Sequence, residues 1–342
     1  MVKKNILLVT NQINGKNGWS TVGANIYLYL QNDKVYNVDV IEYNHTNLKL
    51  KNILYNIYVS IFHIKNNKYY DLILCNVETL IINALLLKIR FKIKKMGMIG
   101  HGTYAIIPFI YLKYFYFRIV KKSLDFIIVP SEYTKNQVKK WYSGSIHKIK
   151  WGVNSKNINF KYYSKNNNNL LFIGELKERK GVEILLELFE KLSLKYEVKL
   201  NIVGKYNNHY KTLIKNHKYS NNIVLHGSVD DSQLDSIFKN TKINILPSVS
   251  KNNHFEGYGL VHLEANAYGI PTIGSYDCGN EEVIKDNLNG YLCNQNDIDS
   301  LYSKISLLLS DDILYKQISI KAFEFAAKNS WEMNLRSLNE IL

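Results

Sequence analysis

Short apolar runs alternate with longer segments of helical periodicity along the whole chain. Runs of about four apolar residues bounded by turn residues are typical of buried strands. In the first half these runs are Asn5–Val9, Val38–Ile41, Leu72–Cys75, Gly97–Ile99 and Phe126–Val129, and in the second half Leu170–Ile173, Lys199–Val203, Ile223–Leu225, Ile243–Leu246 and Thr272–Gly274. Helical patterns such as Val22–Leu30 and Glu132–Trp141 lie between them, and the tail from Asp299 to Leu342 is mainly helical. The alternation predicts βαβ units and two parallel sheets.

The length favours two domains over one. A chain of 342 residues suits two α/β domains of similar size. The polar, low-complexity segment Ser164–Asn169 is typical of a linker. We therefore expect an N-terminal domain over residues 1–155, a C-terminal domain over residues 156–325, and a last helix over residues 326–342 that packs back on the N-terminal domain.

The positive charge is confined to the first half. The net charge is +15, and residues 1–155 contain 22 Lys/Arg against 7 Asp/Glu, whereas residues 156–342 contain 22 of each. The first half is therefore expected to meet an anionic partner, such as nucleic acid, lipid headgroups or a diphosphate-linked substrate. A solubilising basic surface is the plain alternative.

Cysteines and hydropathy indicate the compartment. Three cysteines without a CxxC spacing form neither a disulfide framework nor a metal motif, which fits a reducing cytoplasm. The first apolar run is too short for a signal peptide, and no stretch reaches the roughly 18 apolar residues needed to span a bilayer. We expect a cytoplasmic protein that can lie on a membrane without crossing it.

Two runs in the first half interleave cations with apolar side chains. They are Lys88–Lys95 and Ile110–Arg118. Such surfaces suit a membrane interface, where cations meet headgroups and aromatic rings enter the boundary layer. For Lys88–Lys95 we favour the membrane. For Tyr111–Phe117 we favour packing in the domain core.

The segment Phe255–Pro271 contains the strongest local pattern for ligand binding. Two glycines, Gly257 and Gly259, precede a helix predicted over Leu260–Tyr268, and this arrangement lets a phosphate approach unpaired backbone N–H groups. Glu256 lies before the helix and Glu264 just over one turn inside it. One carboxylate can face the reacting end of a ligand while the other accepts hydrogen bonds from hydroxyl groups. A capped amphipathic helix with two solvated glutamates is the alternative.

Three further features are weaker. His101 ends a buried strand, where α/β active sites gather, although an isolated histidine is more often structural. The loop Gly15–Gly23, which contains Gly18, opens a helix without being a clean phosphate-binding motif. Asp297 and Asp299 resemble an Asp-x-Asp metal motif, but we interpret them as helix caps. No metal or cofactor is expected.

Motifs along nearly the whole chain resemble those of the retaining glycosyltransferases of the family 4 type. Glu256 and Glu264 resemble that family's Glu-x7-Glu motif, and Phe172–Gly181 its strand–loop–helix donor motif. Further matches, in the family's order, are Leu225–Val229, Ile245–Ser248, Gly279–Ile284 with Asn289–Leu292, and Trp331. The resemblance implies an α/β GT-B fold, in which two Rossmann-like domains face a central cleft.

The resemblance also implies roles for individual residues. Glu264 would bind the ribose hydroxyls of a nucleotide-sugar donor, and Glu256 would lie near the transferred sugar. The backbone of Gly257, Tyr258, Gly259 and Leu260 would contact that sugar and its phosphate. Lys180 would neutralise the diphosphate as the glycosidic bond breaks. His101 would contact the sugar or stabilise charge, and the loop with Gly18 would face the donor phosphates.

One departure affects the phosphate contacts. The family usually has Arg, a second cation for the diphosphate, where this sequence has Glu175, and a carboxylate cannot replace it. Arg179, four residues further on, is the candidate substitute. A second departure, Asn154 in place of the usual Asp, is mild.

These observations predict a hexosyltransferase-type glycosyltransferase with a nucleotide-diphosphate sugar donor and a glycan or lipid-linked acceptor. It would act in surface polysaccharide or glycolipid synthesis, with an anionic membrane as a further partner of the N-terminal domain. A nucleotide-sugar epimerase on the same scaffold, or a binding protein whose activity has lapsed, are the alternatives. A nucleic-acid binder would explain the charge but not the motifs of the neutral second half.

Overall fold

The computed structural model describes residues 3–15, 17–44, 49–63, 68–110, 115–154 and 167–342. The chain forms two compact units, the first comprising Met1–Trp151 with Asn334–Leu342, and the second Gly152–Met333. The division falls between Trp151 and Gly152, and the tail segment Asn334–Leu342 belongs to the first unit.

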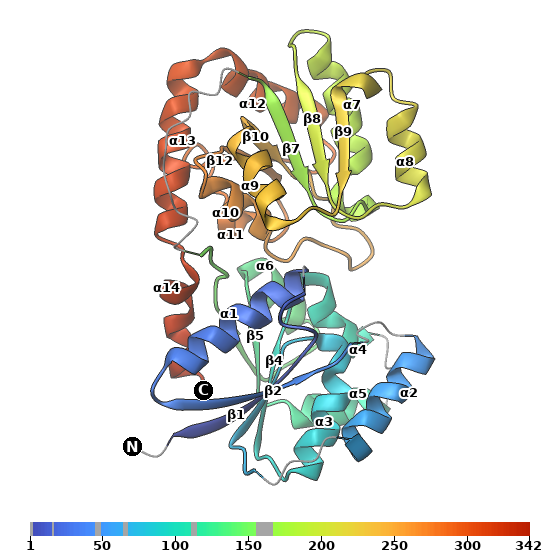
Figure 1. Ribbon diagram of the computed structural model, residues 1–342, viewed down its shortest axis with the longest axis vertical. Helices are drawn as coiled ribbons and strands as arrows, with labels where there is room; N and C mark the ends of the chain where they lie inside the picture. Colours follow the sequence, from blue (N-terminus) through green and yellow to red (C-terminus); the bar gives the residue numbers. More distant parts are fainter. Residues whose placement is uncertain (1–2, 16, 45–48, 64–67, 111–114, 155–166) are drawn as a thin grey trace. The chain divides into compact units, whose positions relative to one another are not determined.

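The first unit is built on a six-stranded sheet in the order β2-β1-β3-β4-β5-β6 (Figure 1). Its strands are β1 (Lys4–Thr10), β2 (Tyr36–Glu42), β3 (Leu72–Cys75), β4 (Lys95–Ile99), β5 (Phe126–Val129) and β6 (Ser145–Lys148). Its helices are α1 (Gly18–Asn32), α2 (Leu50–Tyr58), the π-helix η1 (Val59–His63), η2 (Glu78–Leu80), α3 (Ile81–Arg90), η3 (Gly102–Ile106), α4 (Ile107–Ile110), α5 (Phe115–Ser123), α6 (Glu132–Lys139) and the C-terminal η7 (Arg336–Glu340).

The second unit has a six-stranded sheet in the order β12-β11-β10-β7-β8-β9. Its strands are β7 (Asn169–Ile173), β8 (Lys199–Val203), β9 (Ile223–Gly227), β10 (Ile243–Ile245), β11 (Thr272–Ser275) and β12 (Gly290–Cys293). Its helices are η5 (Glu178–Lys180), α7 (Val182–Ser193), α8 (Asn208–Lys215), η6 (Ser220–Asn222), α9 (Asp231–Lys239), α10 (Leu260–Asn266), α11 (Asn280–Val283), α12 (Ile298–Ser310) and α13 (Asp312–Ala327). α14 (Trp331–Leu335) spans the boundary between the units.

Burial explains why most of the strands could be predicted from apolar runs in the sequence. Every strand pair in the two sheets is parallel across the described residues. Helices cover both faces of such a sheet, so its inner strands are apolar throughout. In β3 and β5 every residue is buried, and the core of the second unit forms where α7 and α12 pack over its strands. The prediction of two parallel sheets is confirmed.

Some elements depart from the predictions. β6 and β12 were not predicted, because the exposed, polar β6 is an edge strand and β12 starts at a glycine.

The predicted capping role of Asp297 is confirmed, since its carboxylate accepts a hydrogen bond of 2.9 Å from the backbone N–H of Ser300. The side chains of Tyr111–Phe117, which we expected to pack in the core, lie outside the described residues.

Candidate functional site

Strand order locates the position in each sheet where a ligand is expected. In open α/β sheets ligands bind beyond the carboxyl ends of the strands, where the strand order reverses. In the second unit this point lies between β7 and β10, and in the first between β1 and β3. The loops that follow these four strands contain most of the side chains discussed below.

In the second unit, backbone contacts join the loops after β7 and β10. The backbone N–H of Val249 donates to the carbonyl oxygen of Arg179 at 2.9 Å. Gly181 has a φ of +68°, and a Cβ there would lie 1.9 Å from the carbonyl oxygen of Pro247. Only glycine tolerates this left-handed conformation so close to another backbone. These contacts fix the preceding residues, Arg179 and Lys180, at the switch point.

Two cations share one carboxylate oxygen at this position. The Nζ of Lys180 and the Nη1 of Arg179 both donate to Oε2 of Glu256, with the Arg179 bond at 3.2 Å. The Lys180 and Glu256 side chains are only 11% and 12% exposed. Burial alone would raise the pKa of Glu256, but the two cations overcome it and lower that pKa to about 2. Burial lowers the pKa of Lys180, while Glu256 opposes this effect.

The sequence left open whether Arg179 lies where it could replace the cation lost at Glu175. In the structure Arg179 and Lys180 contact the same carboxylate oxygen of Glu256. The carboxylate of Glu175 pairs instead with Lys177 at 2.8 Å, and both of those side chains are exposed. The local charge of the Lys180, Arg179 and Glu256 cluster is therefore +1 while Glu256 is ionised. Displacing Glu256 would leave two cations for an anionic ligand.

The turn before α10 is packed too tightly for side chains. Gly259 has a φ of +78°, and a Cβ on it would lie 2.5 Å from Oδ1 of Asn280. The backbone N–H of Gly279 donates to the carbonyl oxygen of Glu256 at 2.7 Å. Tyr258 is buried, and Leu260 opens a helix of only seven residues. Because so short a helix has a weak macrodipole, the side-chain cations are the stronger anion-binding feature of the second unit.

Glu264 lies four residues into α10 and is half-buried. Within the described parts of the chain its carboxylate accepts no hydrogen bond. Burial raises the pKa of Glu264 to about 7. A half-buried carboxylate without a donor suits a ligand that supplies hydroxyl groups. The structure brings Lys180, Arg179 and Glu256 into contact, and Glu264 stands apart from their ion pairs.

His262 lies inside the same motif and was not predicted to matter. It is fully buried, and its Nδ1 lies 3.1 Å from Nδ2 of Asn244, which can only donate. Burial lowers the pKa of His262 to about 3, so the ring is neutral. Its role is to pack behind the turn at Gly259, where it lies against Asn280.

In the first unit, His101 follows β4 and is held by the loop after β3. Its Nε2 lies 2.8 Å from the carbonyl oxygen and 3.2 Å from the Oδ1 of Asn76. A carbonyl oxygen only accepts, so Nε2 bears the proton and Nδ1 retains its lone pair. Burial lowers the pKa of His101 to about 4, which keeps the ring neutral near pH 7. A neutral Nδ1 can accept a hydrogen bond from a hydroxyl group.

Glu78 joins two loops, and sequence reasoning missed it. Its fully buried carboxylate accepts one hydrogen bond from the backbone N–H of His101 and another, of 3.0 Å, from Nε1 of Trp19. Asn76 adds a bond of 2.8 Å to the carbonyl oxygen of Trp19. The loops after β1 and β4 are thus held by the loop between them. Burial raises the pKa of Glu78 to about 8, although the N–H donors oppose this shift.

Gly18 starts α1 directly beside Trp19. A Cβ on Gly18 would meet no atom within 4 Å, so packing within the first unit does not require a glycine there. The helix is capped by Asn17, whose side chain accepts from the backbone N–H of Ser20 at 3.0 Å. The space beside Gly18 leaves this helix start open to a ligand.

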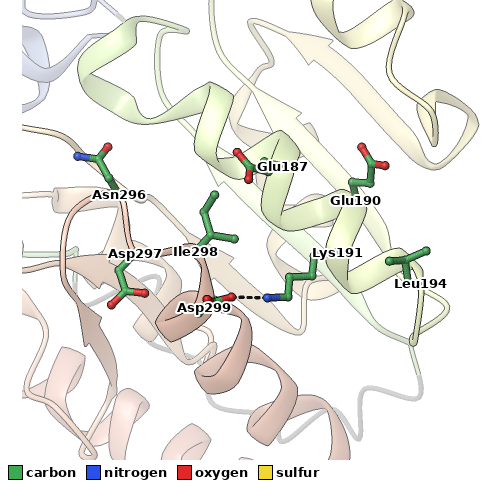
Figure 2. A pocket seen from close by; sticks show the side chains of 8 residues that line it. All are labelled: Glu187, Glu190, Lys191, Leu194, Asn296, Asp297, Ile298 and Asp299. Carbon is green, nitrogen blue, oxygen red and sulfur yellow. Dashed lines mark hydrogen bonds and ion pairs between the residues drawn. The ribbon is translucent and has the colours of Figure 1, made fainter.

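A groove elsewhere on the second unit does not suit a diphosphate. It has a volume of about 490 Å³ and lies between α7 and the start of α12 (Figure 2). Its lining contains four carboxylates and a single cation, Lys191, which is paired with Asp299. An anion would be repelled there.

Metal-ligating side chains do not cluster in the parts of the chain that the structure describes, since no three His, Cys, Asp or Glu residues gather there. In the same parts, every helix is too short or too polar to cross a bilayer.

The two parallel six-stranded sheets, one in each unit, define an α/β protein. Residues 154–325 match the model of the family described as glycosyl transferases group 1. A Methanocaldococcus jannaschii protein named as an uncharacterised glycosyltransferase, MJ1178, is 30% identical over 71% of this chain and 67% of its own length. The Bacillus subtilis poly(glycerol-phosphate) alpha-glucosyltransferase is 32% identical over 42% of this chain and 22% of its own length.

A solved structure supports the same assignment of the fold. The structure of Anabaena HepE, in complex with UDP and glucose, superposes with a TM-score of 0.76 at 15% identity and covers 99% of both chains. The chain belongs to the group 1 glycosyltransferases and is a transferase with a GT-B fold.

The shared carboxylate predicts an asymmetric response to mutation. Replacing Glu256 with Gln leaves two cations unpaired in a buried site and should lower the free energy of unfolding by about 3–5 kcal/mol. The double variant Glu256→Gln/Lys180→Met should recover much of this loss. Glu178→Gln, which removes an exposed ion pair with Lys251, should cost about 1 kcal/mol or less. Urea unfolding measures all three, and equal costs for Glu256 and Glu178 would contradict the buried pairing.

The wild-type ion pair also predicts a pH dependence. Because the pKa of Glu256 falls from 4.5 to about 2 on folding, its contribution to stability is complete above pH 4.5 and is lost as the pH falls towards 2. The Glu256→Gln variant should lack this component of acid unfolding.

Glu78 predicts a pH dependence of the opposite sign. Folding raises its pKa from 4.5 to about 8, so its contribution to stability is present below pH 4.5 and is lost as the pH rises towards 8. Between these values the wild type should lose stability relative to Glu78→Gln, by about 1.4 kcal/mol for each pH unit at most. Urea unfolding at several pH values tests this, with the exposed Glu197→Gln as the control. Parallel pH curves for wild type and Glu78→Gln would contradict the raised pKa.

Proposed function

We propose that this protein transfers a hexose from a nucleotide-diphosphate donor to a glycan or lipid-linked acceptor, with retention of anomeric configuration. The observation that supports this most directly is the pair of cations, Lys180 and Arg179, on one exchangeable carboxylate at the switch point of the second unit. A diphosphate is the anion that two adjacent cations suit. Membership of a glycosyltransferase family and the UDP bound by a protein of the same fold agree with such a donor.

The proposed roles follow from the charges and hydrogen-bonding capacity of each group. Lys180 and Arg179 neutralise the diphosphate as it leaves, so Arg179 supplies the cation that Glu175 does not. Glu264 accepts hydrogen bonds from the ribose hydroxyls. Glu256, released from the two cations, turns to the sugar.

The chemical step needs no protein nucleophile. The bond between the sugar carbon and the donor phosphate breaks, the acceptor oxygen bonds to that carbon on the same face, and the acceptor proton passes to the departing phosphate oxygen. The two cations stabilise the negative charge that develops on the phosphate. His101, through its neutral Nδ1, accepts a hydrogen bond from a sugar hydroxyl. A bound metal has no part in this scheme.

The cellular setting is part of the proposal. The basic first unit receives the acceptor and lies on the inner face of the membrane, and the product is a surface polysaccharide or glycolipid. A Bacillus subtilis relative named for glucosylation of poly(glycerol-phosphate) agrees with a polymeric acceptor.

Donor binding is the first test. A panel of UDP-, GDP- and ADP-sugars should contain a ligand that stabilises the protein by about 2.7 kcal/mol at 100 times its dissociation constant. Glu264→Ala should abolish the stabilisation, and the exposed Glu324→Ala should not. Because hydroxyl donors favour the ionised carboxylate, wild-type affinity should rise with pH through the pKa of about 7 and that of Glu264→Gln should not. Thermal unfolding measures each, and an unchanged shift in Glu264→Ala removes Glu264 from the site.

Transfer is the second test. With the stabilising donor and a panel of octyl glycosides as acceptors, product NMR should show the anomeric configuration of the donor. Lys180→Gln should lower kcat by about 10²–10³, as the loss of one transition-state charge partner does. An inverted product would refute retention. Conversion of the donor without acceptor would favour an epimerase, and binding without transfer would favour a lapsed enzyme.

A further inference from the structure

In helix α2 and the π-helix η1 that continues it, a polar face is buried against the protein and an apolar face is exposed. Three polar residues spaced four apart, Asn52, Asn56 and Ser60, face the protein, and Asn56 and Ser60 are 4% and 1% exposed. On the outside, Leu54 is 56% and Phe62 is 62% exposed. A surface helix of a globular protein normally buries its apolar face and exposes its polar face.

Hydrogen bonds through the hydroxyl of Ser60 hold the buried polar face, so the orientation is built into the fold. The hydroxyl of Ser60 donates to the carbonyl oxygen of Asn56 at 2.8 Å and lies 2.6 Å from the hydroxyl of Tyr43. Nδ2 of Asn83, on α3, donates to the same hydroxyl at 3.0 Å. Turning the helix over to hide its apolar face would break this network and bury polar groups without partners.

The exposed side chains form one stripe, which we call the α2 stripe. They are Leu54, Tyr55, Tyr58, Ile61 and Phe62, each 41% exposed or more. The spacing of three and four residues places them on one face of the helix. In Figure 1, α2 lies at the outer edge of its unit. Contiguous apolar surface of this kind marks an interaction site.

The surroundings of the α2 stripe are cationic. Nη1 of Arg90, at the end of α3, donates to the carbonyl oxygen of Ser60 at 2.8 Å, so the guanidinium is fixed beside the stripe. Ile89, next to it, is 66% exposed, and the exposed Lys51 lies on α2 itself. The sequence has no Asp or Glu in residues 43–70 or 79–124, which together contain 13 Lys and Arg.

We infer that the α2 stripe is a membrane-docking surface that inserts into the interface of an anionic lipid bilayer. Aliphatic and aromatic side chains enter the boundary layer while neighbouring cations meet headgroup phosphates. A second copy of this chain is a poorer occupant, because a two-fold contact would place the same cations against one another. The inference rests on the membrane position in the proposed function and deepens it, because it assigns insertion to α2 and η1. Ile89 and Arg90, from the basic run Lys88–Lys95, lie beside them.

The test is flotation with phosphatidylcholine vesicles, with and without phosphatidylglycerol. The wild type should float with the anionic vesicles, less so at high salt. Leu54→Ser/Phe62→Ser should reduce the partition coefficient by at least about tenfold, because each side chain loses the free energy of apolar burial. The control Leu194→Ser/Ile313→Ser removes two apolar residues from the second unit that are even more exposed, at 69% and 74%, and should float as the wild type does.

Two further measurements separate the contribution of the cations from that of the apolar stripe, and docking from donor binding. Lys51→Gln/Lys92→Gln preserves the apolar stripe and should weaken flotation only with anionic vesicles. Donor-induced stabilisation should be unchanged in every variant, so a failure of docking and a failure of the proposed function can be told apart. If Leu54→Ser/Phe62→Ser fails to fold, single substitution of Phe62 with Ser replaces it.

The inference is overturned if the wild type does not float, or if the stripe and control variants float equally. It is also overturned if light scattering finds a dimer that Leu54→Ser/Phe62→Ser abolishes, which would assign the stripe to a second copy. Capture of an acidic protein through the stripe, without vesicle binding, would assign it to a protein partner and equally exclude the membrane.

Discussion

The structure depends on one constraint, which is that parallel sheets must be covered on both faces. All strand pairs across the described residues are parallel, so most of the strand side chains in the sheet interiors are apolar. Functional groups are left with the loops beyond the carboxyl ends of the strands. The two units obey this rule independently, with Lys180 and Glu256 in one, and Glu78 and His101 in the other. Each group lies near the point where its sheet reverses strand order.

That constraint also explains what the sequence could predict. Ten of the strands were predicted from short apolar runs, which are longest in strands buried on both faces such as β3 and β5, whereas the edge strand β6 has no such run. Glu256 and Glu264 were named as candidates because their spacing forms a motif beside and within one helix, and Lys180 because the segment Phe172–Gly181 resembles a family motif. Glu78 was missed because its partners, Trp19 and His101, are distant in sequence, and only the order β1-β3-β4 brings their loops together. The pairing of Arg179 with Glu256 likewise joins residues 77 positions apart.

The exposure of the apolar face of α2 could not be predicted from the sequence, for a different reason. Periodicity identifies an amphipathic helix but not which face turns inward, and the usual rule assigns the apolar side to the core. Here Tyr43, Asn83 and Arg90 provide polar partners, and they lie 17, 23 and 30 positions from Ser60 in sequence. The basic run Lys88–Lys95 was visible in the sequence, but the α2 stripe became visible only with the contacts of Ser60.

The carboxylate that bridges Lys180 and Arg179 has a consequence for selectivity. Glu256 is part of the same chain, so it competes for the two cations at the high effective concentration of a tethered group. Any anion that enters must displace it. Inorganic phosphate, with few contacts of its own, competes poorly against this internal rival, whereas a ligand that also engages Glu264 has additional binding energy to offset the exchange. If the proposed function holds, this resident counter-ion would keep phosphate off the two cations in a phosphate-rich medium.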